Sequence, residues 1–367
     1  MNVSSTLMAP AMTTERLPIV ECGSAEPRAR GRAHGEILGT IIRDKVGRWH
    51  AAIEAEYGEA PAPFLERLLK GTRFRSAIER YTPDLMEEVL GIAEGAGIGT
   101  ETAYALQLMD EEWWFGRAVH DGHCSGAAIA PAGRDTTVMG QTMDLPAWHD
   151  GAQALLRLHD RDGRRSLVFT SAGMIGLMGL SGHGLGVCVN TLSALRSRPD
   201  GLPVAFVMRG ALAKETVGDA ARFLSDVPHA SGQNYLIGDA RTVHAFECSA
   251  AGASEVVAQH GRILHTNHPL ASSDLRAGAI PSENSKARLD ALAAECGTPH
   301  GKPAETIKAA LASRRENAAI SMERGPDMRP TQLMSVGGVV YEIGDAMRFW
   351  VSGGPPGPHV WREVALD

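Results

Sequence analysis

The chain has 367 residues, 44% of them hydrophobic and 22% charged, enough to bury a sizeable core in one large domain or two smaller ones. Its net charge of −7, without runs of Lys or Arg, argues against a nucleic-acid partner or an anionic membrane surface. No apolar run is long enough to span a membrane, and residues 1–14 lack the basic and apolar regions of a signal peptide. We therefore expect a cytoplasmic protein with no membrane partner.

The cysteines indicate a reducing compartment. The five of them, at positions 22, 124, 188, 248 and 296, form neither a CxxC zinc pattern nor a disulfide framework. His120, His123 and Cys124 are close enough in sequence to hold zinc, but no carboxylate pattern or partner motif supports that reading, and the pair His265 and His268 is equally weak. We expect no metal and no cofactor.

The residues before position 124 are predicted to be mostly helical. Apolar residues recur at helical spacing over 26–56, for example at Ile37, Ile41, Ile42 and Val46, and again over 83–96. The Trp113-Trp114-Phe115 cluster that follows either shapes a substrate pocket or packs in the core.

After position 124 the pattern changes to short apolar or alternating runs separated by Gly, Asp and Asn. Strands are predicted at 127–130, 137–141, 153–158, 166–171 and 185–192, and then at 233–238, 243–248, 255–258, 263–266, 332–341 and 347–352. Helices are predicted at 203–225, with a break near Thr216, and at 283–296 and 303–313. This order is typical of two antiparallel sheets covered by helices.

One glycine-rich stretch, residues 173–182, invites a nucleotide-binding interpretation. It lacks the Lys-Ser/Thr of a P-loop and a following helix, so a β-hairpin lining a pocket is the better prediction. Residues 181–184 would supply its turn, and Met174 belongs to an apolar wall that also includes the side chains at 177, 178 and 180.

The stretch Asp121-Gly122-His123-Cys124-Ser125-Gly126 is typical of a self-cleaving nucleophile, although an isolated internal Cys is also common as a small buried hydrophobe. A thiol in a strained peptide can attack the preceding carbonyl, here that of His123, to give a thioester that water hydrolyses. Cys124 would then be a new N-terminus. Its α-amine, with a reference pKa of roughly 7.7–8.0 against about 8.5 for a thiol, could act as the base.

Several sequence blocks follow one another in a recognisable order from about residue 31 to residue 356. They are Gly31-Arg32-Ala33-His34-Gly35-Glu36, Tyr81-Thr82-Pro83-Asp84-Leu85-Met86-Glu87-Glu88, Gly91-Ile92-Ala93-Glu94-Gly95-Ala96-Gly97, Gly184-Leu185-Gly186-Val187-Cys188-Val189-Asn190, Gly232-Gln233-Asn234-Tyr235, His265-Thr266-Asn267-His268, Asn284-Ser285-Lys286-Ala287-Arg288-Leu289 and Gly353-Gly354-Pro355-Pro356. Through them the chain resembles the acyl-coenzyme A:6-aminopenicillanic acid acyltransferase family of N-terminal-nucleophile hydrolases. The resemblance implies an α+β fold, a four-layer αββα sandwich. Residues 1–123 would be a helical pro-region or small subunit and 124–367 the catalytic large subunit, together one globular unit.

The resemblance also implies roles for single residues. Cys124 would be the nucleophile, Asp144 would orient its amine, and Asn190 and Asn267 would hold the oxyanion. Without the matching blocks, these Asp and Asn residues would be read as ordinary turn residues.

Arg288 would lower the thiol pKa or bind a carboxylate, unless it is a surface helix residue. Ser125, Met174, Trp113 and Trp114 are expected in the substrate pocket.

Two positions depart from the family pattern. His123 stands where many relatives have Gly, which would relieve crowding at the cleaved peptide and suggests slower or incomplete cleavage here. Thr142-Met143 replaces the usual Asn-Trp before Asp144.

The sequence thus predicts a self-processing cysteine amidohydrolase for a small N-acyl or aminoacyl amide, whose partners are that small molecule and the two subunits of one precursor. The alternatives are an acyltransferase that passes the acyl group to an amine, and a non-catalytic or zinc-binding homologue. A homo-oligomer is left open.

Overall fold

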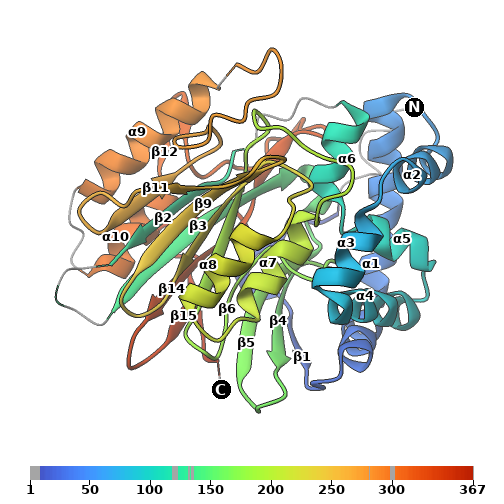
Figure 1. Ribbon diagram of the computed structural model, residues 1–367, viewed down its shortest axis with the longest axis horizontal. Coiled ribbons are helices and arrows are strands. Elements are labelled where there is room, and N and C mark those ends of the chain that lie inside the picture. The colour runs from blue at the N-terminus through green and yellow to red at the C-terminus, as the bar shows by residue number, and fades with distance from the viewer. Residues whose placement is uncertain are drawn as a thin grey trace.

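The computed structural model describes residues 9–117, 123–130, 133, 136–280, 282–297 and 302–366. Two β-sheets face each other between helical layers, and a group of helices from the N-terminal third of the chain packs beside them (Figure 1).

One sheet has eight strands. In spatial order they are β1 (Ile19–Cys22), β4 (Gln153–His159), β5 (Arg165–Ser171), β6 (Met178–Leu180), β7 (Gly186–Thr191), β8 (Gln233–Gly238), β9 (Val243–Ser249) and β10 (Gly252–Val256). β1 runs parallel to β4, and all other neighbours in this sheet are antiparallel. Because β1 belongs to the N-terminal region, that region is joined to the sheet by backbone hydrogen bonds.

The second sheet has six antiparallel strands. They are, in spatial order, β11 (Arg262–His265), β2 (Ser125–Ile129), β3 (Thr137–Pro146), β14 (Leu333–Ile343), β15 (Arg348–Ser352) and β16 (Arg362–Val364). A separate two-stranded ribbon joins β12 (Arg314–Arg315) and β13 (Ala318–Ala319). Cys124 immediately precedes β2, so the candidate nucleophile lies where an interior strand of this sheet begins.

Helices cover the outer faces of both sheets. α7 (Val204–Leu212) and α8 (Val217–Asp226) pack on the eight-stranded sheet, and α9 (Glu283–Gly297) and α10 (Pro303–Leu311) pack on the six-stranded sheet. The break expected near Thr216 is present, because its hydroxyl accepts a hydrogen bond from the backbone N–H of Asp219 and caps α8. The predicted α+β class and the αββα order of layers are confirmed.

The N-terminal region supplies the remaining helices: α1 (Pro27–Tyr57), α2 (Pro61–Lys70), α3 (Phe74–Tyr81), α4 (Pro83–Ala96), α5 (Thr100–Ala105) and α6 (Met109–Gly116). Short 3₁₀ turns lie at Thr14–Arg16 and Ala147–His149. α1 and α4 pack closely through glycines. A Cβ on Gly31 would lie 1.9 Å from the carbonyl oxygen of Glu88, and one on Gly95 would lie 2.2 Å from that of Arg32. The glycine blocks noted in the sequence therefore allow two helix backbones to touch.

Buried polar contacts join the N-terminal helices to the sandwich. The Glu88 carboxylate of α4 accepts hydrogen bonds from Arg30 of α1 and from Arg209 of α7. Lys45 Nζ donates to the carbonyl oxygen of Ala172 at 2.9 Å, and the backbone N–H of Gly173 donates to His34 Nε2 at 3.0 Å. The contacts from Lys45 and His34 fix the turn after β5.

Five strands differ from the sequence-based expectation, and β12, β13 and β16 were not predicted. The strand expected at 255–258 is β10, Gly252–Val256, because the β9–β10 hairpin turns earlier and Gly252, at φ +120°, pairs with Ser249. The short strand β1 was not predicted. Within the described ranges, no helix is both long and apolar enough to cross a membrane.

Candidate active site

Strand register brings Cys124 and Asp144 together. Ser125 pairs with Thr142 in the β2–β3 ladder, so the residue before β2 reaches the end of β3. The backbone N–H of Asp144 donates to the Cys124 sulfur at 3.4 Å, and the Met143 sulfur lies 4.0 Å from it. The thiol is buried. Burial, with a smaller contribution from the Asp144 charge, raises the pKa of Cys124 to about 12, so the thiol is protonated at neutral pH in the intact chain.

The Asp144 side chain is 3% exposed, and neither carboxyl oxygen has a hydrogen bond of normal geometry among the described residues. Burial raises the pKa of Asp144 to about 7, although the Ser335 hydroxyl and the Arg288 charge oppose the rise. Ser335 is its register partner on β14, next to a β-bulge. A carboxyl group with a pKa near 7 can hold or release a proton under physiological conditions.

Arg288 projects from α9 to the peptide between residues 123 and 124. Its Nη1 donates to the His123 carbonyl oxygen at 2.6 Å, to that of Cys124 at 3.1 Å and to the Ser125 hydroxyl at 3.0 Å. Nη2 donates to Asn267 Oδ1 at 2.9 Å, and Nε donates to Asn284 Oδ1 at 2.9 Å. The side chain is fully buried, so the alternative of a surface helix arginine is wrong. Ser125 touches this guanidinium and does not line the cavity described below.

The two candidate oxyanion donors have different surroundings. Asn190 of β7 accepts a hydrogen bond from Asn234 at 3.2 Å, while its own Nδ2 is buried without a partner among the described residues. It lies against Gly126, where an added Cβ would be 3.3 Å from Asn190 Oδ1. Asn267 instead donates from Nδ2 to the Thr191 carbonyl oxygen at 2.9 Å and accepts from Arg288. In the intact chain, Asn190 holds a free buried donor and Asn267 orients Arg288.

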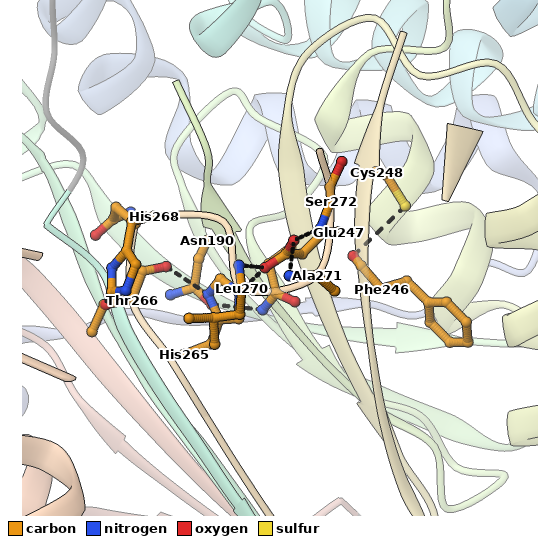
Figure 2. Close-up of polar contacts among 12 residues, drawn as sticks. Asn190, Phe246, Glu247, Cys248, His265, Thr266, His268, Leu270, Ala271 and Ser272 are labelled. Carbon is orange, nitrogen blue, oxygen red and sulfur yellow. Dashed lines mark hydrogen bonds and ion pairs between the residues drawn. The ribbon is translucent and has the colours of Figure 1, made fainter. Parts of the chain in front are cut away.

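A buried polar network around Glu247 and His265 is shown in Figure 2. The Glu247 carboxylate of β9 accepts from the backbone N–H groups of Leu270, Ala271 and Ser272, and His265 Nε2 lies 2.8 Å from it. The other ring nitrogen of His265 lies 2.7 Å from the Thr266 carbonyl oxygen. His265 thus bridges the Glu247 carboxylate and the backbone of Thr266 within this buried network.

Cys124 opens onto a cavity of about 20 Å³, room for roughly one water molecule. Its walls include Met174, as expected for the 173–182 stretch, although residues 172–177 form turns and bends and only Met178–Leu180 is a strand. Sequence reasoning missed Asp110 of α6, Thr191 of β7 and Gln233 of β8, which also line it. The three acids that open α6, at 110–112, were the available signal.

Trp113 and Trp114 were expected in the pocket, and the cavity lining does not include them. The Trp114 ring makes edge contacts with the rings of Phe74 and Phe115, and Trp113 is buried in the main hydrophobic cluster. In the intact chain both side chains thus fit the core-packing alternative, and their place in a substrate pocket stays a prediction.

The alternative of a zinc-binding protein depends on His120 and His123. Burial lowers the pKa of His123 to about 4, which keeps its ring neutral, and His120 lies outside the described residues. In the part of the chain that the structure describes, the side chains spaced to hold an ion are Asp160, Asp162 and His183. They lie at the β4–β5 and β6–β7 turns, and none of them lines the Cys124 cavity.

A model of the family described as acyl-coenzyme A:6-aminopenicillanic acid acyl-transferase matches residues 132–311. A relative from Emericella nidulans, named acyl-coenzyme A:6-aminopenicillanic-acid-acyltransferase 40 kDa form, is 27% identical over 216 residues. The match covers 56% of this chain and 57% of the relative, so it spans little more than half of that protein's length. The predicted family resemblance is confirmed.

Solved structures of other proteins also align with the chain. A variant of conjugated bile acid hydrolase from Clostridium perfringens gives a TM-score of 0.44 at 11% identity, covering 66% of this chain and 92% of that one. A Caenorhabditis elegans ortholog of N-acylethanolamine-hydrolyzing acid amidase gives a TM-score of 0.43 at 14% identity, covering 59% and 91%.

The region matched to the acyl-coenzyme A:6-aminopenicillanic acid acyltransferase family contains Asp144, Asn190, Asn267 and Arg288, and begins eight residues after Cys124. Gln141, in the Gly-Gln of the family's block before Asp144, bridges the two sheets: it donates to the Val189 carbonyl oxygen and accepts from the Val189 N–H at 2.7 Å. This contact holds β3 and β7 together beside the cavity.

Proposed function

We propose that this chain is a self-processing cysteine amidohydrolase that cleaves small amides through a thioester on Cys124. The observation that carries the proposal is the position of Arg288, whose Nη1 lies 2.6 Å from the His123 carbonyl oxygen. A buried guanidinium donating to the carbonyl that the neighbouring thiol would attack is suited to stabilising the oxyanion.

In the proposed self-cleavage, Cys124 Sγ attacks the carbonyl carbon of His123. The S–C bond forms, the His123–Cys124 C–N bond breaks, and the thiol proton ends on the α-nitrogen of Cys124. Water then hydrolyses the thioester, which leaves a carboxylate on His123 and restores the thiol. Asp144, whose pKa of about 7 lets it exchange a proton, can take the thiol proton and pass it to that nitrogen.

The same groups would turn over a substrate. Cys124 attacks the amide carbonyl, its free α-amine accepts the thiol proton and delivers it to the leaving amine, and water hydrolyses the thioester. The unpartnered Nδ2 of Asn190 supports its role as oxyanion donor, and Asn267 would contribute its second N–H or hold Arg288 in place. The cavity of the intact chain has room for roughly one water, which supports a zymogen whose pocket opens after cleavage.

An acyltransferase is the second candidate, because the matched relative from Emericella nidulans carries that name. An acceptor amine would then replace water at the thioester. Adding an amine to the assay and measuring how the acyl group divides between acid and new amide distinguishes the two activities. The five cysteines are unpaired and buried, which supports the proposed reducing, cytoplasmic location.

The test is intact-mass spectrometry of the purified wild-type protein and of Cys124→Ala, with N-terminal sequencing of any fragment. We expect two chains from the wild type, the larger beginning at Cys124, and one uncut chain from the variant. Cys296→Ala, which changes another buried cysteine away from this cavity, is the matched control and should still be cut.

An uncut wild-type chain, or a cut at another position, would contradict the proposal. Metal analysis of the same samples addresses the remaining alternative, since an uncut chain with one bound zinc would indicate the zinc-binding homologue.

A further inference from the structure

Asp110 presents a carboxyl group to the same cavity as the candidate nucleophile. It lies in the first turn of α6 and is 5% exposed. The Thr191 hydroxyl donates to its Oδ1 at 2.9 Å, and Gln233 is a further hydrogen-bond partner. Both partners are neutral, so no described side chain supplies a positive charge to this carboxylate.

The rest of the cavity is apolar and adaptable. Four methionines line it, at 109, 143, 174 and 208, together with leucine, valine and alanine side chains. None of its lining residues is Lys, Arg or His. Methionine side chains have three rotatable bonds, so these walls can reshape around a small ligand.

A buried carboxyl group without a cation is unfavourable, because an ionised carboxylate away from water needs a charged or strongly donating partner. Asp144 faces the same cavity with both oxygens unpartnered among the described residues. Burial raises the pKa of Asp144, and the Arg288 charge opposes the rise. The backbone N–H of Asp144 donates to the Cys124 sulfur, so the new α-amine of Cys124 would add a second cation on that side of the cavity. The Asp110 carboxylate has no such partner among the described side chains, so it can pair with a cation that the ligand carries.

We propose that Asp110 selects substrates: the pocket takes small amides that carry a protonated amino group a few bonds from the scissile carbonyl, and this ammonium binds the Asp110 carboxylate. This inference rests on the proposed amidase function and narrows its substrate class to amino-substituted acyl amides. It also makes the N-terminal region, through α6, part of the substrate pocket.

The test compares ligands that differ only in this charge. The pairs are glycinamide with propionamide, β-alaninamide with butyramide, and 4-aminobutyramide with valeramide, in which a methyl group replaces the ammonium. Binding to purified wild-type protein is measured by titration calorimetry, and the corresponding 4-nitroanilides are used for kcat/KM. The variants are Asp110→Asn, Thr191→Val, and Asp84→Asn as an exposed control.

We expect the wild type to favour the ammonium member by about tenfold or more for at least one chain length, as for a charge-assisted hydrogen bond. Asp110→Asn should abolish this preference while changing the neutral member less than about twofold. Thr191→Val, which retains the carboxylate, and Asp84→Asn should keep it.

Equal binding of both members by the wild type at every length would overturn the proposal. An equal loss for both members in Asp110→Asn would also overturn it, because Asp110 would then act on the nucleophile or on packing. Failure of the proposed function is read separately, as an uncut chain in the mass spectrum. The binding comparison is made on protein that the mass spectrum shows to be cut, because the cavity of the intact chain has room for roughly one water. An uncut chain would overturn the proposed function and this inference with it, whereas the comparison on cut protein tests Asp110 alone.

Discussion

At the residue scale, the Arg288 guanidinium is fixed by acceptors around it. Asn284 and Asn267 accept from Nε and Nη2, which leaves Nη1 directed at the carbonyl oxygens of residues 123 and 124. A planar fork of this kind can serve several acceptors at once, and a lysine ammonium on a flexible stem cannot reproduce it.

Arg288→Lys should therefore slow self-cleavage by about 10²-fold or more, the loss typical when one oxyanion donor is removed. The rate is measured from the intact mass of freshly synthesised protein sampled over time. Arg315→Lys, an exposed residue that pairs with Glu295 of α9, is the control and should cleave at the wild-type rate. Wild-type cleavage in folded Arg288→Lys would rule out the oxyanion role.

The sequence identified part of this site for a physical reason. Cys124, Asp144 and Arg288 occur in blocks whose spacing follows strand register and the start of a helix, so a pattern can reveal them. Asp110 was missed because acids in a first helical turn usually face water and favour the helix dipole. The Asp110 carboxyl group is held inward by tertiary contacts with Thr191 of β7 and Gln233 of β8, and the spacing of residues in the sequence does not reveal such contacts.

At the element scale, the Glu247–His265 pair joins β9 to β11 and to the loop at 268–272. Asn267 lies in the sequence between His265 and this loop, and its backbone N–H donates to Ser285 Oγ at 2.8 Å. The pair thus positions the residue that holds Arg288. A second His–Glu pair, His244 and Glu255 at 2.9 Å, links β9 to β10 on an exposed surface.

Glu247→Gln should lower the free energy of unfolding by about 3 kcal/mol at pH 7, because it removes the buried carboxylate that pairs with His265 and accepts from three backbone N–H groups. Glu247→Gln should also slow self-cleavage, because Asn267 would hold Arg288 less firmly. Glu255→Gln should change the free energy of unfolding and the cleavage rate by little. Although burial opposes it, His265 and the backbone N–H groups hold the pKa of Glu247 below its usual range. Its contribution is therefore present above its unfolded pKa of about 4.3 and is lost as the pH falls through the lower folded value.

Urea unfolding at several pH values, with intact-mass sampling, measures both effects. Equal losses in Glu247→Gln and Glu255→Gln would contradict the positioning role.

Elements with strong periodicity were predictable, and short or edge elements were not. Residues 26–56 and 83–96 correspond closely to α1 and α4, because long amphipathic runs leave little choice of conformation. β1 spans four residues and pairs with β4, more than 130 positions away, so its own sequence contains too little information. β10 was misplaced because a glycine in the hairpin, not its apolar residues, sets where the strand starts.

At the scale of the whole molecule, the peptide joining residues 123 and 124 lies inside one packed unit. The N-terminal region contributes β1 to a sheet, a carboxyl group to the cavity and Glu88 to a buried contact with Arg209. Although burial opposes it, Arg209 and Arg30 hold the pKa of Glu88 at about 2, so the carboxylate stays ionised.

The two chains should therefore elute together in size-exclusion chromatography after self-cleavage. Glu88→Gln should reduce the free energy of unfolding of the complex by about 3 kcal/mol, because it removes the carboxylate from two buried arginines. Glu87→Gln, which changes the neighbouring exposed residue, should have little effect. Separation of the wild-type chains without denaturant would show that the N-terminal region is a detachable pro-segment.

If the chain is cut as proposed, a β-strand of one fragment lies within the sheet of the other, so refolding of the cut protein would differ from folding of the intact chain. The fold forms while the chain is continuous, when β1 finds β4 by an intramolecular search. Once the proposed cut is made, the same pairing must be regained by the meeting of two molecules, at a rate that depends on concentration. Each copy would thus assemble easily only once, and its working lifetime would depend on how slowly it unfolds.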